Sequence, residues 1–148
     1  MSDLRFDVSL HPLPGGLISG PPLVDPRGTW PTIVPPIDAA GMTMTSDFDA
    51  ALERLGALER AFVEPDGSFV WVGPGGEERW QIDGNAYERH GHVLVVETKG
   101  SCPEDIFDRF LAVWGWPGQA LAVQLVRAGV FVDEPTFRRH AVAHGLPG

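Results

Sequence analysis

Apolar residues recur at helical spacing in four stretches of the chain, and each stretch predicts a helix. The first helix begins near Ser46, where Ser46 and Asp49 form a variant of the capping box. Residues 119–128 suit two structures, because their alanines favour a helix whereas their valines suit a strand; we favour the helix. The remaining two helices are predicted over residues 103–114 and 134–143.

Short apolar runs that end at turn residues predict the strands. These runs are residues 62–64, 68–72, 79–88, 92–98 and 130–132. We count three main strands between the first helix and residue 103, so the main elements follow the order α, β, β, β, α, α, β, α. This order predicts an α+β (or α/β) fold in which helices flank a mixed sheet.

The first 45 residues differ in composition from the rest of the chain. Residues 11–41 are rich in proline and glycine, and proline excludes a helix because it lacks the backbone N–H and clashes with the preceding turn. Residues 4–10 alternate between apolar and polar and predict an edge strand. We therefore divide the chain into an extended N-terminal segment, residues 1–45, and a domain of residues 46–148.

The turn Arg89-His90-Gly91 sets which residues face one another across the predicted hairpin. A three-residue loop with glycine last is a common connection, and counting outward from it places Asp83 opposite Glu97. Lys99 lies two residues further along and shares their face. A two-residue loop at His90-Gly91 would turn Asp83 to the other face, unless a β-bulge at Asp83 and the following glycine restored the alignment.

Two carboxylates and an ammonium on one face suggest metal chemistry. Asp83 and Glu97 would repel each other unless a proton or a cation lay between them, and Mg²⁺ takes carboxylate oxygens while keeping several waters. A neighbouring lysine can hold or deprotonate a metal-bound water. The apolar run Val93–Val96 predicts a central strand, which places the charges at its end. The plainer alternative is a salt cluster on an exposed hairpin.

The spacing of Asp83 and, after thirteen residues, Glu97-Thr98-Lys99 resembles the PD-(D/E)XK restriction-endonuclease-like superfamily, whose core is α-β-β-β-α-β. Together with residues 107–111 and 124–127 it is similar to the restriction-endonuclease-fold toxins (fifth family) of bacterial polymorphic toxin systems. The resemblance covers residues 46–143 and implies a metal-dependent nuclease acting on DNA or RNA. Asp83 and Glu97 would bind Mg²⁺ or Mn²⁺, and Lys99 would orient the attacking water. The family motif has a proline before the aspartate, where this chain has isoleucine.

The resemblance also implies accessory residues and partners. A glutamate of the first helix would join the site, with Glu59 as first choice and Glu53 as second. Gln124 and Arg127, three residues apart on one helix face, would contact the substrate. The expected partners are a nucleic-acid substrate and a cognate immunity protein.

Charge narrows the classes of function. The 148-residue chain has a net charge of −9, which argues against a nonspecific nucleic-acid coat protein because phosphate binding needs clustered Lys and Arg. Residues 1–89 carry a charge of −8 and residues 90–148 only −1, so an anionic substrate should meet the second half. The acidity also supports an alternative, a non-catalytic binding protein with a degenerate nuclease fold or an acidic immunity-type role.

Cysteine content and hydropathy bear on the compartment. The single cysteine, Cys102, excludes an internal disulfide and suits a reducing environment. No apolar run approaches the roughly 18 residues of a membrane helix, and the first residues lack the order of a signal peptide. We expect a cytoplasmic protein, or one delivered into a target cell's cytoplasm without a cleavable signal peptide. Oligomeric state and the choice of DNA or RNA stay open.

Overall fold

The chain folds around a nine-stranded sheet with the order β2-β5-β11-β10-β1-β9-β8-β7-β6, and a two-stranded hairpin, β3 and β4, stands beside it. A computed structural model describes the backbone of residues 3–145. The strands are β1 (Leu4–Pro12), β2 (Ile18–Ser19), β3 (Leu23–Asp25), β4 (Gly28–Trp30), β5 (Ile33–Val34), β6 (Ala61–Val63), β7 (Ser68–Val72), β8 (Gln81–Arg89), β9 (His92–Cys102), β10 (Leu121–Leu125) and β11 (Val130–Asp133). The helices are α1 (Phe48–Gly56), α2 (Glu104–Val113) and α3 (Glu134–Gly145), with a 3-10 turn at Ile37–Ala39. The predicted α+β class is confirmed.

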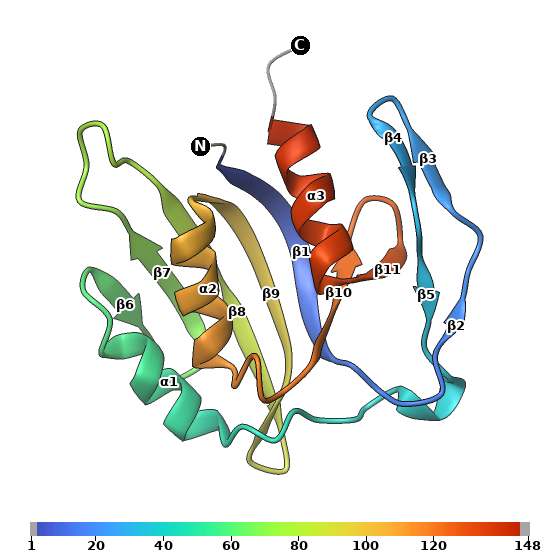
Figure 1. Ribbon diagram of the computed structural model, residues 1–148. Coiled ribbons are helices and arrows are strands. Elements are labelled where there is room, and N and C mark those ends of the chain that lie inside the picture. Colours follow the sequence, from blue (N-terminus) through green and yellow to red (C-terminus); the bar gives the residue numbers. More distant parts are fainter. Residues whose placement is uncertain (1–2, 146–148) are drawn as a thin grey trace.

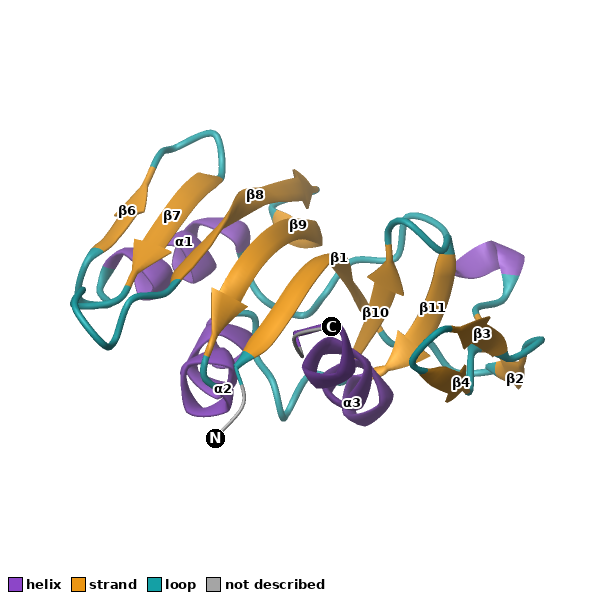
Figure 2. Ribbon diagram, turned by 90° about the horizontal axis from the view of Figure 1, so that it is seen from above, coloured by secondary structure: helices purple, strands orange, loops and turns teal. Residues whose placement is uncertain are grey.

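One face of the sheet is covered by helices. Figure 1 shows α2 and α3 in front of the sheet, and Figure 2 shows both on the same side of the strands. All three helices contribute apolar side chains to one core with this face, including Leu55 of α1, Phe107 of α2 and Phe137 of α3, each at most 1% exposed. We call the opposite side of the sheet the open face, because neither α2 nor α3 covers it; the 3-10 turn lines a pocket there with His11 and Phe131.

The first strand lies at the centre of the sheet, not at its edge as predicted. β1 is hydrogen-bonded to β9 on one side and to β10 on the other. The prediction was wrong because alternation reports that one face of a strand is covered, and does not report how many strands flank it. Residues 4–12 therefore complete the same sheet as strands from residues 46–148.

The sequence predicts a mixed sheet, but the observed sheet is antiparallel, and the position of β1 explains the difference. β9 and β10 both run antiparallel to β1, so they run parallel to each other and α2 crosses between them. Because β1 separates them, every pair of hydrogen-bonded neighbours in the sheet is antiparallel.

The predicted helix over residues 119–128 is wrong. Residues 121–125 form β10, and a turn ending at Gly129, with a positive φ of 71°, leads into β11. Leu121, Val123 and Leu125 alternate into the core. Burial on one face at a period of two residues outweighed the helix propensity of the alanines.

The other predicted elements are present, with shifted ends. α1 begins after Asp47, whose carboxylate accepts a hydrogen bond from the Ala50 N–H at 2.9 Å. Ser46 instead donates its hydroxyl to the carbonyl of Trp114 at 2.9 Å, which ties the start of α1 to the end of α2. Because α1 ends at Gly56, Glu59 lies beyond the helix.

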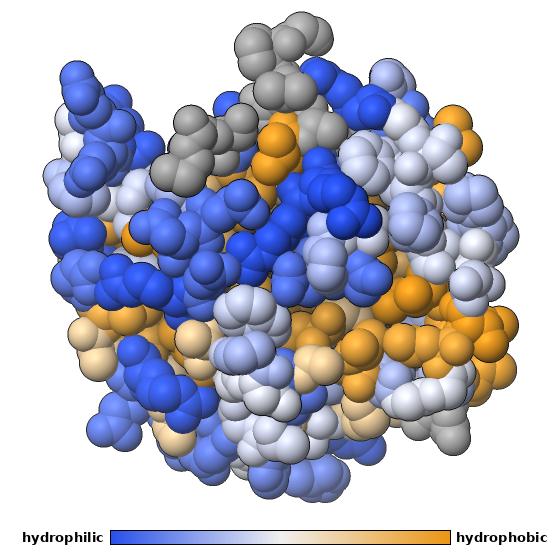
Figure 3. Space-filling model, in the orientation of Figure 1, coloured by the Kyte–Doolittle hydropathy of each residue, from blue (hydrophilic) through white to orange (hydrophobic). Residues whose placement is uncertain are grey.

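The proline- and glycine-rich stretch forms the short strands β2 to β5 and the 3-10 turn. It leaves large apolar side chains exposed, among them Ile18, Val34 and Ile37. Figure 3 shows apolar side chains gathered on the side of the molecule where β2 and β5 lie, and hydrophilic ones over the outer surfaces of the helices. None of the helices formed by the described residues has the length and apolar character to cross a membrane.

Candidate functional site

The β8–β9 hairpin turns differently from the prediction. His90 and Gly91 form a two-residue loop with positive φ angles of 53° and 83°, and Arg89 pairs with His92. Positive φ at both loop positions suits the mirror-image turns that match strand twist. The three-residue loop was therefore wrong, and so was the direct pairing of Asp83 with Glu97.

A β-bulge nevertheless keeps the expected side chains on one face. Between the pairs Tyr87–Val95 and Glu88–Val93, β9 has one extra residue, Leu94. This bulge lies nearer the turn than expected, but it shifts the remaining ladder by one residue and so reverses the face that a two-residue loop alone would assign. Below the bulge Asp83 pairs with Lys99.

Asp83, Glu97 and Lys99 consequently face a common hollow on the open face. Glu97 pairs with Asn85 on β8, two residues from the Asp83–Lys99 pair. The hollow has a volume of about 290 Å³ and is also lined by Asp7 of β1. Asp83 and Glu97 are thus diagonal neighbours, which lie about 7–8 Å apart in a regular ladder, with their Cβ atoms somewhat closer.

Asp7 is a member of this cluster that sequence reasoning missed. It pairs with Lys99 from the side opposite Asp83, so a lysine lies between two aspartates in one row across β8, β9 and β1. Lys99 is the only lysine among the eleven basic residues of the chain. The alternation of residues 4–10 signalled that Asp7 and Ser9 share a face, but only the strand order brings that face beside Lys99.

The next row along the open face is a hydrogen-bonded network. The Tyr87 hydroxyl donates to the Glu97 carboxylate at 2.7 Å, which raises the pKa of Tyr87. On β1, Ser9 donates its hydroxyl to the Gln124 side-chain carbonyl at 3.2 Å and lies 2.8 Å from Nε2 of His11. Burial lowers the pKa of His11, although its contacts with Gln124 and the charge of Glu97 act in the opposite direction. These contacts fix the orientation of the polar side chains beside Glu97.

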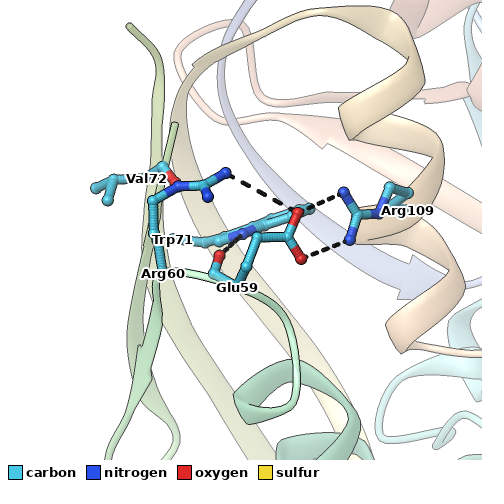
Figure 4. Close-up of polar contacts among 5 residues, drawn as sticks. All are labelled: Glu59, Arg60, Trp71, Val72 and Arg109. Atoms are coloured by element: carbon cyan, nitrogen blue, oxygen red, sulfur yellow. Dashed lines mark hydrogen bonds and ion pairs between the residues drawn. The ribbon is translucent and has the colours of Figure 1, made fainter. Parts of the chain in front are cut away.

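Glu59 does not reach this cluster, so its predicted role at the site is corrected. Its carboxylate makes two hydrogen bonds with the Arg109 guanidinium of α2, at 2.8 and 2.9 Å, and lies 3.9 Å from Arg60 (Figure 4). Its backbone carbonyl accepts the indole N–H of the buried Trp71, which points into the core. Glu59 is therefore on the helix-covered side, and the second choice, Glu53, is an exposed residue of α1.

The ion pair with Arg109 makes a prediction about acid stability. The hydrogen bonds from Arg109 lower the pKa of Glu59 from 4.5 to about 2. The ion pair therefore stabilises the fold fully at pH values above the pKa of Glu59 in the unfolded chain, and this stabilisation is lost as pH falls toward 2. We expect Glu59→Gln to lower the urea midpoint at about pH 5 and to have little effect near pH 2. The effect is modest because both side chains are more than a third exposed.

Urea titrations at both pH values measure this difference. Glu53→Gln removes an exposed acid of α1 and serves as the control, with the same small effect at both pH values. A midpoint difference for Glu59→Gln that does not shrink in acid would contradict the proposed role of the ion pair.

Gln124 and Arg127 lie near the cluster, but not on the predicted helix. Gln124 belongs to β10 and contacts Ser9, which pairs with Glu97. Arg127 lies in the turn between β10 and β11 and lines a larger groove together with Asp83 and Lys99. The tertiary fold thus brings Gln124 beside the cluster from a strand and Arg127 into the neighbouring groove from a turn.

The donors available to a metal at this cluster are carboxylates. Among the described residues, no group of three His, Cys, Asp or Glu side chains is placed to hold one ion. Asp83 and Glu97, which line the same hollow, offer two carboxylates, and Mg²⁺ accepts one or two carboxylates with waters in its other positions. Two carboxylates are therefore the donors that this hollow can offer to a hydrated divalent ion. Cys102 cannot add a thiolate, because it is buried on the other face and burial raises its pKa to about 12.

Comparison of the chain with family models, curated proteins and solved structures returns no significant match.

Proposed function

We propose that this protein is a divalent-metal-dependent nuclease that hydrolyses phosphodiester bonds at the open face. The observation that carries the proposal is the common hollow of Asp83, Glu97 and Lys99 on neighbouring antiparallel strands. Two carboxylates can hold a divalent ion and an ammonium can offset phosphate charge, and metal-assisted phosphodiester hydrolysis can use both.

Each residue has a distinct role in this proposal. Asp83 and Glu97 hold Mg²⁺ or Mn²⁺, and the ion when bound supplies an acidified water and neutralises phosphate charge. Lys99 orients the attacking water and offsets charge on the phosphate. Asp7 and Asp83 pair with Lys99 from both sides and so place its side chain in the same row as their carboxylates. Tyr87 orients the Glu97 carboxylate through its hydrogen bond.

The order of the elements also supports a restriction-endonuclease-like core. Along the chain, the order α-β-β-β-α-β is formed by α1, β7, β8, β9, α2 and β10, with β6 as an additional strand after α1. In the sheet, β1 lies between β9 and β10. Within this proposal the protein is a toxin module of bacterial competition. A cognate immunity protein is then its expected protein partner.

A second candidate is a non-catalytic binding protein. It is favoured by the open face itself, where Tyr87, Val126 and Phe62 are between 43% and 65% exposed, and by the net charge of −9. An acidic sheet face suits a basic protein partner through charge complementarity. Calorimetry with Mn²⁺ separates the two candidates, since a binding protein of this kind releases no heat of metal binding.

The nuclease proposal is tested by cleavage of plasmid DNA and of RNA in Mg²⁺ or Mn²⁺. We expect Glu97→Gln to lower the rate by about 10²-fold or more, because a neutral amide is a poor ligand for a hard cation. Glu88→Gln is the matched control, because Glu88 is an exposed acid on the neighbouring strand that does not line the hollow. Equal rates for wild type and Glu97→Gln, or no cleavage in either metal, would overturn the proposal.

A further inference from the structure

A larger groove continues from the candidate site along the first half of β1. β10 pairs with Val8–Pro12 of β1 and then turns away through residues 126–129, which leaves a gap beside Arg5 and Asp7. The groove in this gap has a volume of about 870 Å³. Its residues come from β1, β3, β8, β9, β10, α3 and the β10–β11 turn, so no single element predicts it.

The groove presents cations and an apolar wall to the same space. Arg5, Lys99 and Arg127 line it from three different elements. Leu23 and the half-exposed Val126 add apolar surface. This arrangement suits a ligand that combines anionic groups with a flat apolar group.

The acidic residues of the groove are not all equally available to repel an anion. The Asp25 carboxylate accepts a hydrogen bond from the Trp30 indole at 3.1 Å and lies 3.0 Å from Nε2 of His140. Asp7 and Asp83 flank Lys99, which offsets part of their charge. Arg5 and Arg127 lie outside this row of three, so we expect an anionic chain to bind mainly to them.

We propose that this groove binds single-stranded nucleic acid through about three phosphates, with an unpaired base against Leu23 and Val126. Three cations limit the number of phosphates that can be neutralised, and a chain of net charge −9 repels a long duplex. A paired base has no free apolar face to offer the wall. The inference rests on the proposed function for its cleavage site and adds the class of substrate.

Fluorescence anisotropy tests binding with metal chelated by EDTA, so that cleavage plays no part. The probes are labelled oligothymidylate and oligouridylate of about eight nucleotides and a duplex of the same length. For the single strands we expect log Kobs to fall with log salt at a slope of about −2, which is about −0.7 for each of three phosphates. The duplex is expected to bind at least tenfold more weakly.

Arg127→Met is expected to reduce the magnitude of the slope by about 0.7 and to weaken binding about fivefold near 0.1 M salt. Arg89→Met is the matched control, because this substitution removes the same charge at the far end of β8. Arg89 does not line the groove. Its slope should equal that of wild type. Equal losses for both variants would show a general charge effect and overturn the groove assignment.

The outcomes for binding and for cleavage are separable. Single-strand binding in EDTA without cleavage in any metal would overturn the proposed nuclease and keep this inference. Cleavage with duplex binding as tight as single-strand binding, or no binding of either probe, would overturn this inference and keep the nuclease.

Discussion

Replacing Lys99 by methionine is expected to lower the rate of phosphodiester cleavage by about 10²–10³-fold, the range for removing one positioned group that stabilises a transition state. The lysine ammonium lies in the row between Asp83 and Asp7, facing the hollow that also contains Glu97. Methionine keeps much of the length and removes the charge. Cleavage should fall far more than single-strand affinity in EDTA, because Lys99 is only one of three cations that contact the chain but acts alone on the attacking water.

Glu59→Gln is the informative comparison for Lys99→Met. The resemblance to the nuclease superfamily gives Glu59 a role at the site, whereas its carboxylate is held by Arg109 on the helix-covered side. The two readings therefore predict opposite results. We expect Glu59→Gln to cleave at the wild-type rate; a loss comparable to that of Lys99→Met would contradict the site as placed on the open face.

A second experiment uses the fact that Lys99 is the only lysine of the chain. An amine-reactive acylating reagent can modify only Lys99 and the N-terminal amine. We expect acylation to abolish cleavage in the wild type. The same treatment of Lys99→Met modifies the N-terminus alone and supplies the baseline, and mass spectrometry confirms which amine has reacted.

Replacing Phe107 by alanine is expected to lower the free energy of unfolding by about 3–5 kcal/mol, the range for truncating a buried phenylalanine. Phe107 of α2 is fully buried, and its ring packs against Phe6 of β1 and Phe137 of α3 with centroids 5.2 and 5.3 Å away. It joins both helices to the central strand. The Arg138 guanidinium lies 5.3 Å from the ring centroid and caps this contact.

Urea unfolding followed by tryptophan fluorescence measures the effect. Phe62→Ala is the matched control, because Phe62 is 65% exposed on the edge strand β6. The same truncation there is expected to change stability by less than about 1 kcal/mol. Similar losses at both positions would contradict the placement of the core between α2, α3 and β1.

The sequence by itself determined the class of the fold and the position of the hairpin, whereas the bulge at Leu94 decided which hairpin residues share a face. The apolar run that begins β9 and the helical periodicity of α2 are visible without any long-range contact. The predicted common face of Asp83, Glu97 and Lys99 is observed although the predicted turn is wrong. The expected ladder and the observed one differ by two residues, and a shift of two preserves the face because side chains alternate with a period of two.

Only the tertiary structure decided the remainder of the site. Residues 121–125 form a strand because β1 and β11 flank them, and helix propensity could not anticipate those partners. Asp7 joins Lys99 because β1 inserts between β9 and β10, a pairing between residues far apart in the chain. Glu59 lies away from the site because α1 ends at Gly56 and Arg109 of α2 binds the Glu59 carboxylate. Local periodicity reports which side of an element is buried, whereas the identity of its neighbours depends on long-range packing that no short window of sequence contains.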